Sequence, residues 1–220
     1  MTFTELVADV KLGLSEEVEA FFTDANISTY LIKAIKRFTK KTKCAIFQQN
    51  ITFVTGTSNY ALTLPVLKMR AIVINDNKTP LLEIAYEDWA RITDTMKYDN
   101  NVCYVKGTSN EIYVPPAFDS GTLYVEYYAK ANDATAADFI NNGYIKDEYH
   151  EAITDYALYL AFRKDQEMSM SSAHLQSYLN WEKMAIKEVE MEEQNPYSND
   201  WDGVGANPHR NDTFFQDRII

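Results

Sequence analysis

The spacing of apolar residues changes twice along this 220-residue chain, and that change constrains the fold more than any other feature. Apolar residues recur every three or four positions before residue 45 and again after residue 146, as on one face of an α-helix. Between these segments they tend to alternate, as in a half-buried β-strand. The pattern predicts an α+β fold in which both ends of the chain form helices around a β-rich insertion.

Residues that begin or end helices divide the segment before residue 45 into three helical runs. Thr4 begins a first run that ends at Gly13, and Ser15 begins a second, because a hydroxyl can accept a hydrogen bond from a first-turn N–H group. Residues 28–43 form a longer helix with Ser28 as its N-cap. These runs are the expected N-terminal part of a helical bundle.

Two longer apolar stripes near the C-terminus predict the rest of the bundle. Residues 147–165 and 171–193 form helices, and the short link between them makes the two helices antiparallel neighbours. The expected organisation is a helical bundle domain, a β-rich insertion domain and an extended C-terminal tail, formed by residues 1–45 with 146–193, by residues 46–145 and by residues 194–220.

Strand-like segments fill the middle of the chain. They are residues 46–47, 51–54, 60–65, 69–74, 81–84, 102–105, 111–114 and 122–128, with one short helix expected over residues 86–96. The sequence Gly-Thr-Ser-Asn occurs twice, at residues 56–59 and 107–110. Because Gly and Asn tolerate positive φ, both copies are predicted to form hairpin turns.

The chain offers few residues for catalysis or metal binding. Cys44 and Cys103 cannot form a disulfide framework or a four-cysteine zinc site, and we expect buried or half-buried thiols. No local signature marks Cys44 as a nucleophile. His150 has no second histidine at the spacing of a helical metal site, so we expect it to be exposed on its helix. The sequence therefore favours a structural or interaction protein without cofactor, metal or catalytic residues.

The start of the sequence shows no basic region followed by an apolar run, so no signal peptide is expected. No stretch approaches the ~18 apolar residues of a membrane span. We expect synthesis in a reducing cytoplasm, which also fits two free cysteines.

Charge is distributed unevenly along the chain. Residues 31–43 hold six bases and no acid, whereas residues 147–193 hold 11 acids and 4 bases. The simplest interpretation is that one basic helix face contacts acidic neighbours, in the same chain or in an adjacent subunit; a nucleic-acid contact and a solvated face are alternatives. The proposed subunit-interface residues on this face are Lys33, Lys36, Arg37 and Lys40. The net charge of −11 argues against general DNA binding.

Large apolar residues remain in the otherwise polar C-terminal tail. They are Trp201, Phe214, Phe215, Ile219 and Ile220. A purely solvating tail rarely keeps such groups, so we interpret them as anchors for a partner; the alternative is a tail that folds back on its own domain. The 15 tyrosines indicate either a Tyr-rich sheet or broad, hydrated interfaces, and the two can coexist.

Three segments resemble the head-to-tail adaptor (connector) proteins of tailed bacteriophages, especially the tail-tubular-A type of short-tailed phages. The first is the helix of residues 28–43, which runs directly into a strand. The second is Tyr60–Pro65, followed by the strand at Met69–Ile74; the family often has Tyr-x-Leu-Pro there, whereas two extra residues precede Pro65 here. The third is the helix pair that begins at Lys146–Ile153 and continues through Tyr156–Ala161.

This resemblance implies a non-enzymatic virion structural protein made in the host cytoplasm. Such adaptors form a homo-oligomeric ring, usually a dodecamer, beneath the portal, and the helical bundles pack side by side in it. The C-terminal tail docks onto the portal protein, and the β-rich insertion faces the tail or nozzle protein. Genomic DNA passes through the channel during ejection without sequence-specific binding. Taken without the resemblance, the residues also allow a soluble cytosolic binding module or a small hydrolase with a β-rich insertion.

Overall fold

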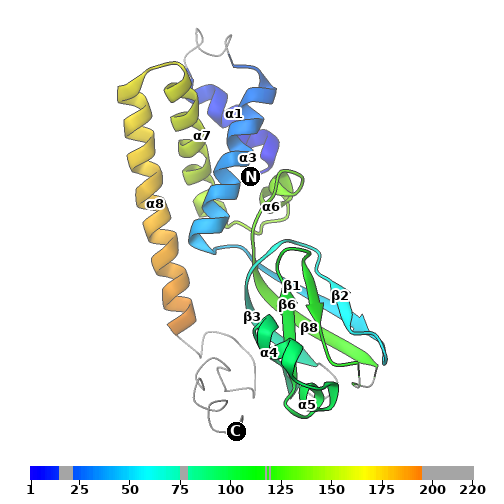
Figure 1. Ribbon diagram of the computed structural model, residues 1–220. Helices are drawn as coiled ribbons and strands as arrows, with labels where there is room; N and C mark the ends of the chain where they lie inside the picture. The colour runs from blue at the N-terminus through cyan, green and yellow to red at the C-terminus, as the bar shows by residue number, and fades with distance from the viewer. Residues whose placement is uncertain (15–21, 75–78, 117, 119, 195–220) are drawn as a thin grey trace.

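The computed structural model describes residues 1–14, 22–74, 79–116, 118 and 120–194, and within them the chain is an α+β protein. Figure 1 shows long helices on one side of the molecule and two β-sheets on the other. The helices are α1 (Phe3–Gly13), α3 (Asp24–Thr42), α6 (Ala136–Asn141), a 3-10 turn (Asp147–Tyr149), α7 (His150–Lys164) and α8 (Met168–Gln194). Two shorter helices, α4 (Tyr86–Arg91) and α5 (Asp94–Asp99), accompany the sheets.

Two of the three N-caps predicted for the N-terminal helices, Thr4 and Ser28, are wrong by a few residues. Thr2, not Thr4, caps α1: its side chain accepts a hydrogen bond from Glu5 N–H while the Glu5 carboxylate accepts one from Thr2 N–H. This reciprocal pair satisfies two free donors at once, which Thr4 could not do from inside the helix. The end of α1 at Gly13 is as predicted, and the run expected from Ser15 lies outside the described residues.

The helix α3 starts before the predicted Ser28. Thr23 is its N-cap, and its hydroxyl accepts a hydrogen bond from Asn26 N–H at 3.4 Å. Ile27 is buried, so the apolar stripe begins one turn earlier than the sequence pattern indicated. The helix ends at Thr42, and the φ of 55° at its C-cap, Lys43, turns the chain out of the helix and toward the first strand.

The strands form two four-stranded sheets. In sheet order the first contains β1 (Ile46–Phe53), β8 (Gly121–Ala129), β3 (Val66–Ile74) and β4 (Thr79–Pro80), all antiparallel. The second contains β2 (Asn59–Ala61), β7 (Glu111–Tyr113), β6 (Val102–Lys106) and β5 (Leu82–Glu83), of which only β5 and β6 are parallel. The strand expected over residues 60–65 is therefore short, because the chain leaves the second sheet after Ala61 to enter the first at Val66.

The repeated Gly-Thr-Ser-Asn sequence has two different structures. At residues 107–110 it forms the predicted hairpin between β6 and β7, with Asn110 at φ 53°. At residues 56–59 the hairpin prediction is wrong, because β1 pairs along its length with β8 while β2 pairs with β7. That copy carries the chain from one sheet to the other.

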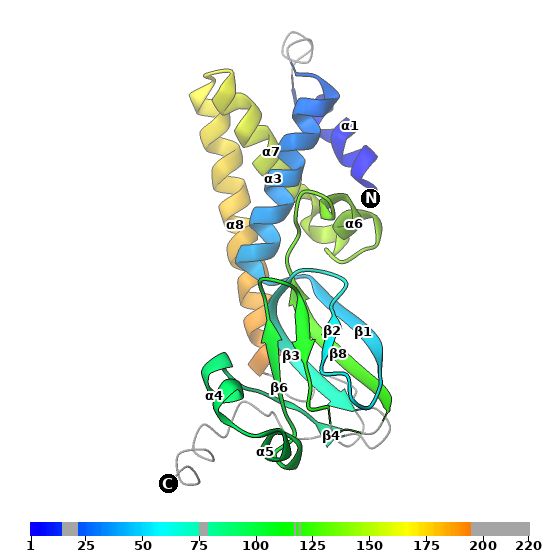
Figure 2. The same ribbon diagram turned by 45° about the vertical axis from the view of Figure 1, so that its right-hand side comes forward.

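The short helix predicted over residues 86–96 is two helices, and α6 was not predicted. The predicted helix is divided at Thr93, because this residue is the N-cap of α5 and its hydroxyl accepts a hydrogen bond from Met96 N–H. One continuous apolar core joins the helices and the sheets, and within it the Phe38 ring packs against those of Tyr149 and Tyr178. Figures 1 and 2 show α7 and α8 side by side and antiparallel, with the end of α8 reaching the level of the first sheet.

Candidate interaction surfaces

Two of the four predicted interface bases on α3 are bound within the chain. Lys36 donates a hydrogen bond to the Asp133 carboxylate at 2.7 Å, and Arg37 Nε lies 3.7 Å from Glu182 Oε2 on α8. The Arg37 guanidinium also lies over the rings of Tyr156 and Tyr178, 5.2 and 5.5 Å from their centroids. Arg37 therefore links α3, α7 and α8, in the way that a guanidinium stacked on aromatic faces can.

The other two bases, Lys33 and Lys40, are exposed. Neither forms an ion pair with any residue that the structure describes, and the Lys33 ammonium lies 5.8 Å from the ring centroid of Tyr30. Their spacing of seven residues places them two turns apart on the same face of α3. These two side chains, rather than all four, remain available to another molecule.

Acidic residues at the end of α8 bind bases outside that helix. Lys146 forms ion pairs with Glu188 and with Glu192, the latter at 3.6 Å, and Tyr149 donates a hydrogen bond to Glu188. Lys68 on β3 lies 2.9 Å from Glu193. The first contacts join the end of α8 to the start of the 3-10 turn η1, and the Lys68–Glu193 pair joins it to the first sheet.

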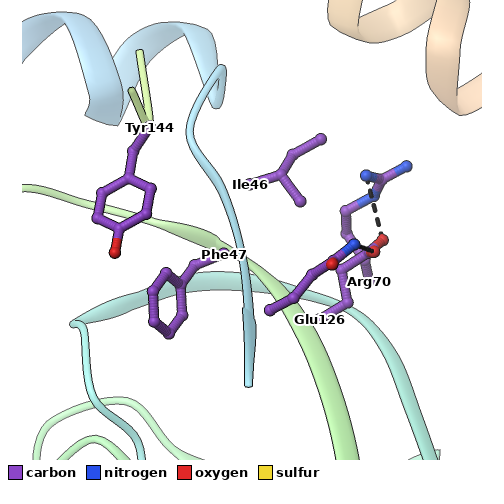
Figure 3. A pocket seen from close by; sticks show the side chains of 6 residues that line it. Ile46, Phe47, Arg70, Glu126 and Tyr144 are labelled. Atoms are coloured by element: carbon purple, nitrogen blue, oxygen red, sulfur yellow. Dashed lines mark hydrogen bonds and ion pairs between the residues drawn. The ribbon is translucent and has the colours of Figure 1, made fainter. Parts of the chain in front are cut away.

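An open pocket of about 600 Å³ lies at the start of β1 (Figure 3). It is lined by Ile46, Phe47, Gln48, Arg70, Glu126 and Tyr144. Arg70 Nη1 lies 3.1 Å from Glu126 Oε1, and Gln48 and Tyr124 donate hydrogen bonds to Oε2 at 2.6 and 3.1 Å. Because these partners occupy both carboxylate oxygens, the cluster joins β1, β8 and β3.

Cysteine chemistry is disfavoured by burial. Burial raises the pKa of the Cys44 thiol to about 12, and burial with the nearby Glu83 carboxylate raises the pKa of Cys103 well above its ordinary value. Both are therefore thiols at neutral pH, whereas the thiolate is the nucleophile. Cys103 is buried and Cys44 is half-buried, as predicted. The described residues hold no group of three or more His, Cys, Asp or Glu side chains placed to bind a metal ion.

The prediction that His150 is exposed is wrong: its side chain is only 2% exposed. The residue begins α7 where η1, α1 and the chain start converge, and its Nδ1 lies 3.5 Å from Asp147 Oδ1. Burial lowers the pKa of His150, the N-terminal ammonium lowers it further, and Asp147 opposes both. The spacing of apolar residues could not show this, because the covering groups come from other segments.

We expect His150 to make the fold sensitive to mild acid. Its folded-state pKa lies below its unfolded value of ~6.5, so the unfolded chain binds the proton more readily. Neutral His150 therefore makes its full contribution to the free energy of unfolding above the unfolded-state pKa, and this contribution falls as the pH drops below that pKa. Urea unfolding from pH 7.5 to 5 should show a steeper loss in the wild type than in His150→Gln. His174→Gln is the control, and equal slopes in wild type and His150→Gln would contradict the assignment.

The proposed portal anchors, Trp201, Phe214, Phe215, Ile219 and Ile220, lie outside the described residues. Sequence inspection missed the Arg70–Glu126 pair. Its signal was one base and one acid in two otherwise apolar strand segments, which antiparallel pairing brings together. In the described part of the chain no helix has both the length and the apolar character of a membrane span.

Comparison with known proteins agrees with the resemblance found in the sequence. The model of the SU10 adaptor protein family matches residues 1–202, which is most of the chain and includes its helical and β-rich parts. No match was found among curated proteins. Because the match spans far more than half of the sequence, the chain belongs to the SU10 adaptor protein family, a family of bacteriophage head-to-tail adaptors.

Proposed function

We propose that this chain forms the ring that joins the portal of the capsid to the tail and lets genomic DNA pass through its channel. The family match over residues 1–202 is the observation that carries this proposal. In the virion neck, residues 1–45 and 146–193 act as the helical domain that contacts neighbouring copies. Residues 46–145 face the tail or nozzle protein, and residues 194–220 dock onto the portal protein.

The charges on the helices support a closed ring of identical subunits. Such a ring needs two different, complementary surfaces on each copy. Lys33 and Lys40 offer a basic surface on α3, while Glu151 on α7 and Glu190 on α8 are exposed acids. The net charge of −11 suits a channel through which DNA slides, because binding of phosphates requires clustered bases.

Native mass measurement and negative-stain imaging test the proposal directly. The purified chain is examined alone and mixed with the portal protein from the same genome. A ring of many copies that forms in the presence of the portal is the expected result. A stable monomer that neither assembles nor binds the portal would contradict it.

Ring assembly should depend on Lys33 and Lys40. We expect Lys33→Glu with Lys40→Glu to reduce the fraction of chain in rings, and added salt to reduce it in the wild type, because exposed charge pairs are screened. Neither substitution removes an ion pair within the described residues, so the melting temperature should stay nearly unchanged. Asp99→Lys, a charge reversal at an exposed site on α5, is the control. Assembly that is indifferent to both salt and charge reversal would exclude this surface from the interface.

A further inference from the structure

Four aromatic rings form a connected surface on the second sheet, beside α4. We call it the aromatic patch; it consists of Tyr86, Trp89, Tyr104 and Tyr113. Tyr104 is at its centre, with ring centroids 5.4 Å from Tyr86, 6.4 Å from Trp89 and 5.7 Å from Tyr113. Tyr104 and Tyr113 are directly paired across β6 and β7, so their side chains leave the same face of the sheet.

This face is directed away from the core. The residues that alternate with the two tyrosines, Cys103 and Ile112, are fully buried. The helices α4 and α5 contain no buried residue, and Tyr86 is 60% exposed. Figure 2 shows both helices with the sheets, far from the connection between α7 and α8. Tyr86 is exposed, and Trp89, Tyr104 and Tyr113 are half-buried, so the chain presents a Tyr- and Trp-rich surface that it covers only in part.

The polar atoms of the patch are also available. Among the described residues, no hydrogen bond is made by the hydroxyls of Tyr86 and Tyr104 or by the indole N–H of Trp89. Tyr113 alone is engaged, donating a hydrogen bond to Glu111 at 3.2 Å. Rigid rings with free polar tips are typical of the centres of protein–protein interfaces.

The charges around the patch indicate what kind of partner fits it. Glu87 and Asp88 are exposed on α4 between Tyr86 and Trp89, and neither has an ion pair within the described residues. The Lys97 ammonium already lies over the Trp89 ring, 4.4 Å from its centroid, so the ring of the patch most open to a partner's cation is that of Tyr86, which is 60% exposed. A partner with Arg or Lys side chains would gain both ring stacking and ion pairing here. Phosphates would be repelled by the same acids, which disfavours single-stranded nucleic acid despite the rings.

We propose that the aromatic patch is the surface that binds the tail-side neck protein, through a segment of that protein that carries basic side chains. The proposal rests on the proposed function, because it assumes that the β-rich part of the ring faces the tail. It adds which face of that part makes the contact and what chemistry the partner presents.

The test measures binding of the purified tail-side neck protein of the same phage to portal-assembled rings and to the free chain. We expect Tyr86→Ala with Trp89→Ala to weaken binding at least about tenfold, as truncation of central interface aromatics does. Glu87→Lys with Asp88→Lys should weaken it as well, although no ring is removed. Tyr98→Ala is the matched control, because this exposed tyrosine packs on Phe118, outside the patch.

Each outcome supports or overturns the proposal. Loss of tail-protein binding in both patch variants, with normal rings and with normal binding by Tyr98→Ala, supports it. Unchanged binding in the patch variants overturns it, as does a loss of ring assembly, which would make the patch a contact between copies. A single-stranded oligonucleotide that binds the wild type and not the patch variants also overturns it. Failure of the wild type to assemble on the portal contradicts the proposed function alone, because the free chain is scored separately against the tail protein.

Discussion

Removing residues 196–220 should abolish binding to the portal protein and leave the rest of the fold intact. Among the described residues the buried core lies between Leu6 and Val189, and the truncation removes none of those side chains. The shortened chain also keeps Glu193, which holds α8 to the first sheet through Lys68. We expect a change in melting temperature below about 3 °C, which for a chain of this size corresponds to less than ~1 kcal/mol. Portal binding should fall below detection, because the five large apolar anchors are removed together.

Point substitutions distinguish the contribution of the five apolar anchors to portal binding from the contribution of the tail's length. Serine at Trp201, Phe214, Phe215, Ile219 and Ile220 in the full chain should reproduce the loss. Alanine at Ser198, Asn199, Asn207, Asn211 and Thr213 is the matched control and should preserve binding. A truncated chain that binds the portal as tightly as the full one would refute the docking role. A fall in melting temperature of about 10 °C would instead favour a tail that folds back on its own domain.

The order of helices and strands was predictable because it depends on local spacing of apolar residues. The spacing of apolar residues does not indicate which strands pair, because pairing joins residues that are far apart in the chain. The two copies of Gly-Thr-Ser-Asn make this clear: one closes a hairpin and the other crosses between sheets, according to where β2 finds its partner. The predicted N-caps differ from the observed ones for a related reason. Several hydroxyl side chains near each helix start can act as the cap, and the burial of Ile27 in α3 favours Thr23.

The interaction surfaces were predictable only in part. The cluster of bases on α3 is visible in the sequence, yet only the structure separates Lys36 and Arg37, which bind acids of the same chain, from Lys33 and Lys40. The aromatic patch combines residues from α4, β6 and β7, which no sequence window contains together. His150 was misjudged because neighbours from other segments, and not its own helix, bury it.

The substitution with the largest expected effect on stability is Arg70→Ala. The Arg70 and Glu126 side chains are only 13% and 8% exposed, so the change leaves a carboxylate buried in β8 without its opposite charge. Breaking a buried ion pair from one side typically costs about 3–5 kcal/mol, and the loss of ring contact with Tyr128, 5.3 Å from the guanidinium, acts in the same direction. Urea unfolding should show this loss of free energy.

A double substitution and a neighbouring pair test whether the uncompensated charge is the cause. Arg70→Met with Glu126→Leu should recover much of the lost stability, because two apolar side chains need no partner charge. Lys68→Ala is the matched control on the same strand: Lys68 and Glu193 are 45% and 35% exposed, and such exposed pairs contribute less than ~1 kcal/mol. Two results would contradict this explanation. One is an equal loss of unfolding free energy in Arg70→Ala and Lys68→Ala; the other is a double variant that is no more stable than Arg70→Ala. Either would mean that burial does not determine how much the ion pair contributes to stability. If the expected order is found, the Arg70–Glu126 pair is a side-chain link between β3 and β8 whose burial makes it costly to break from one side.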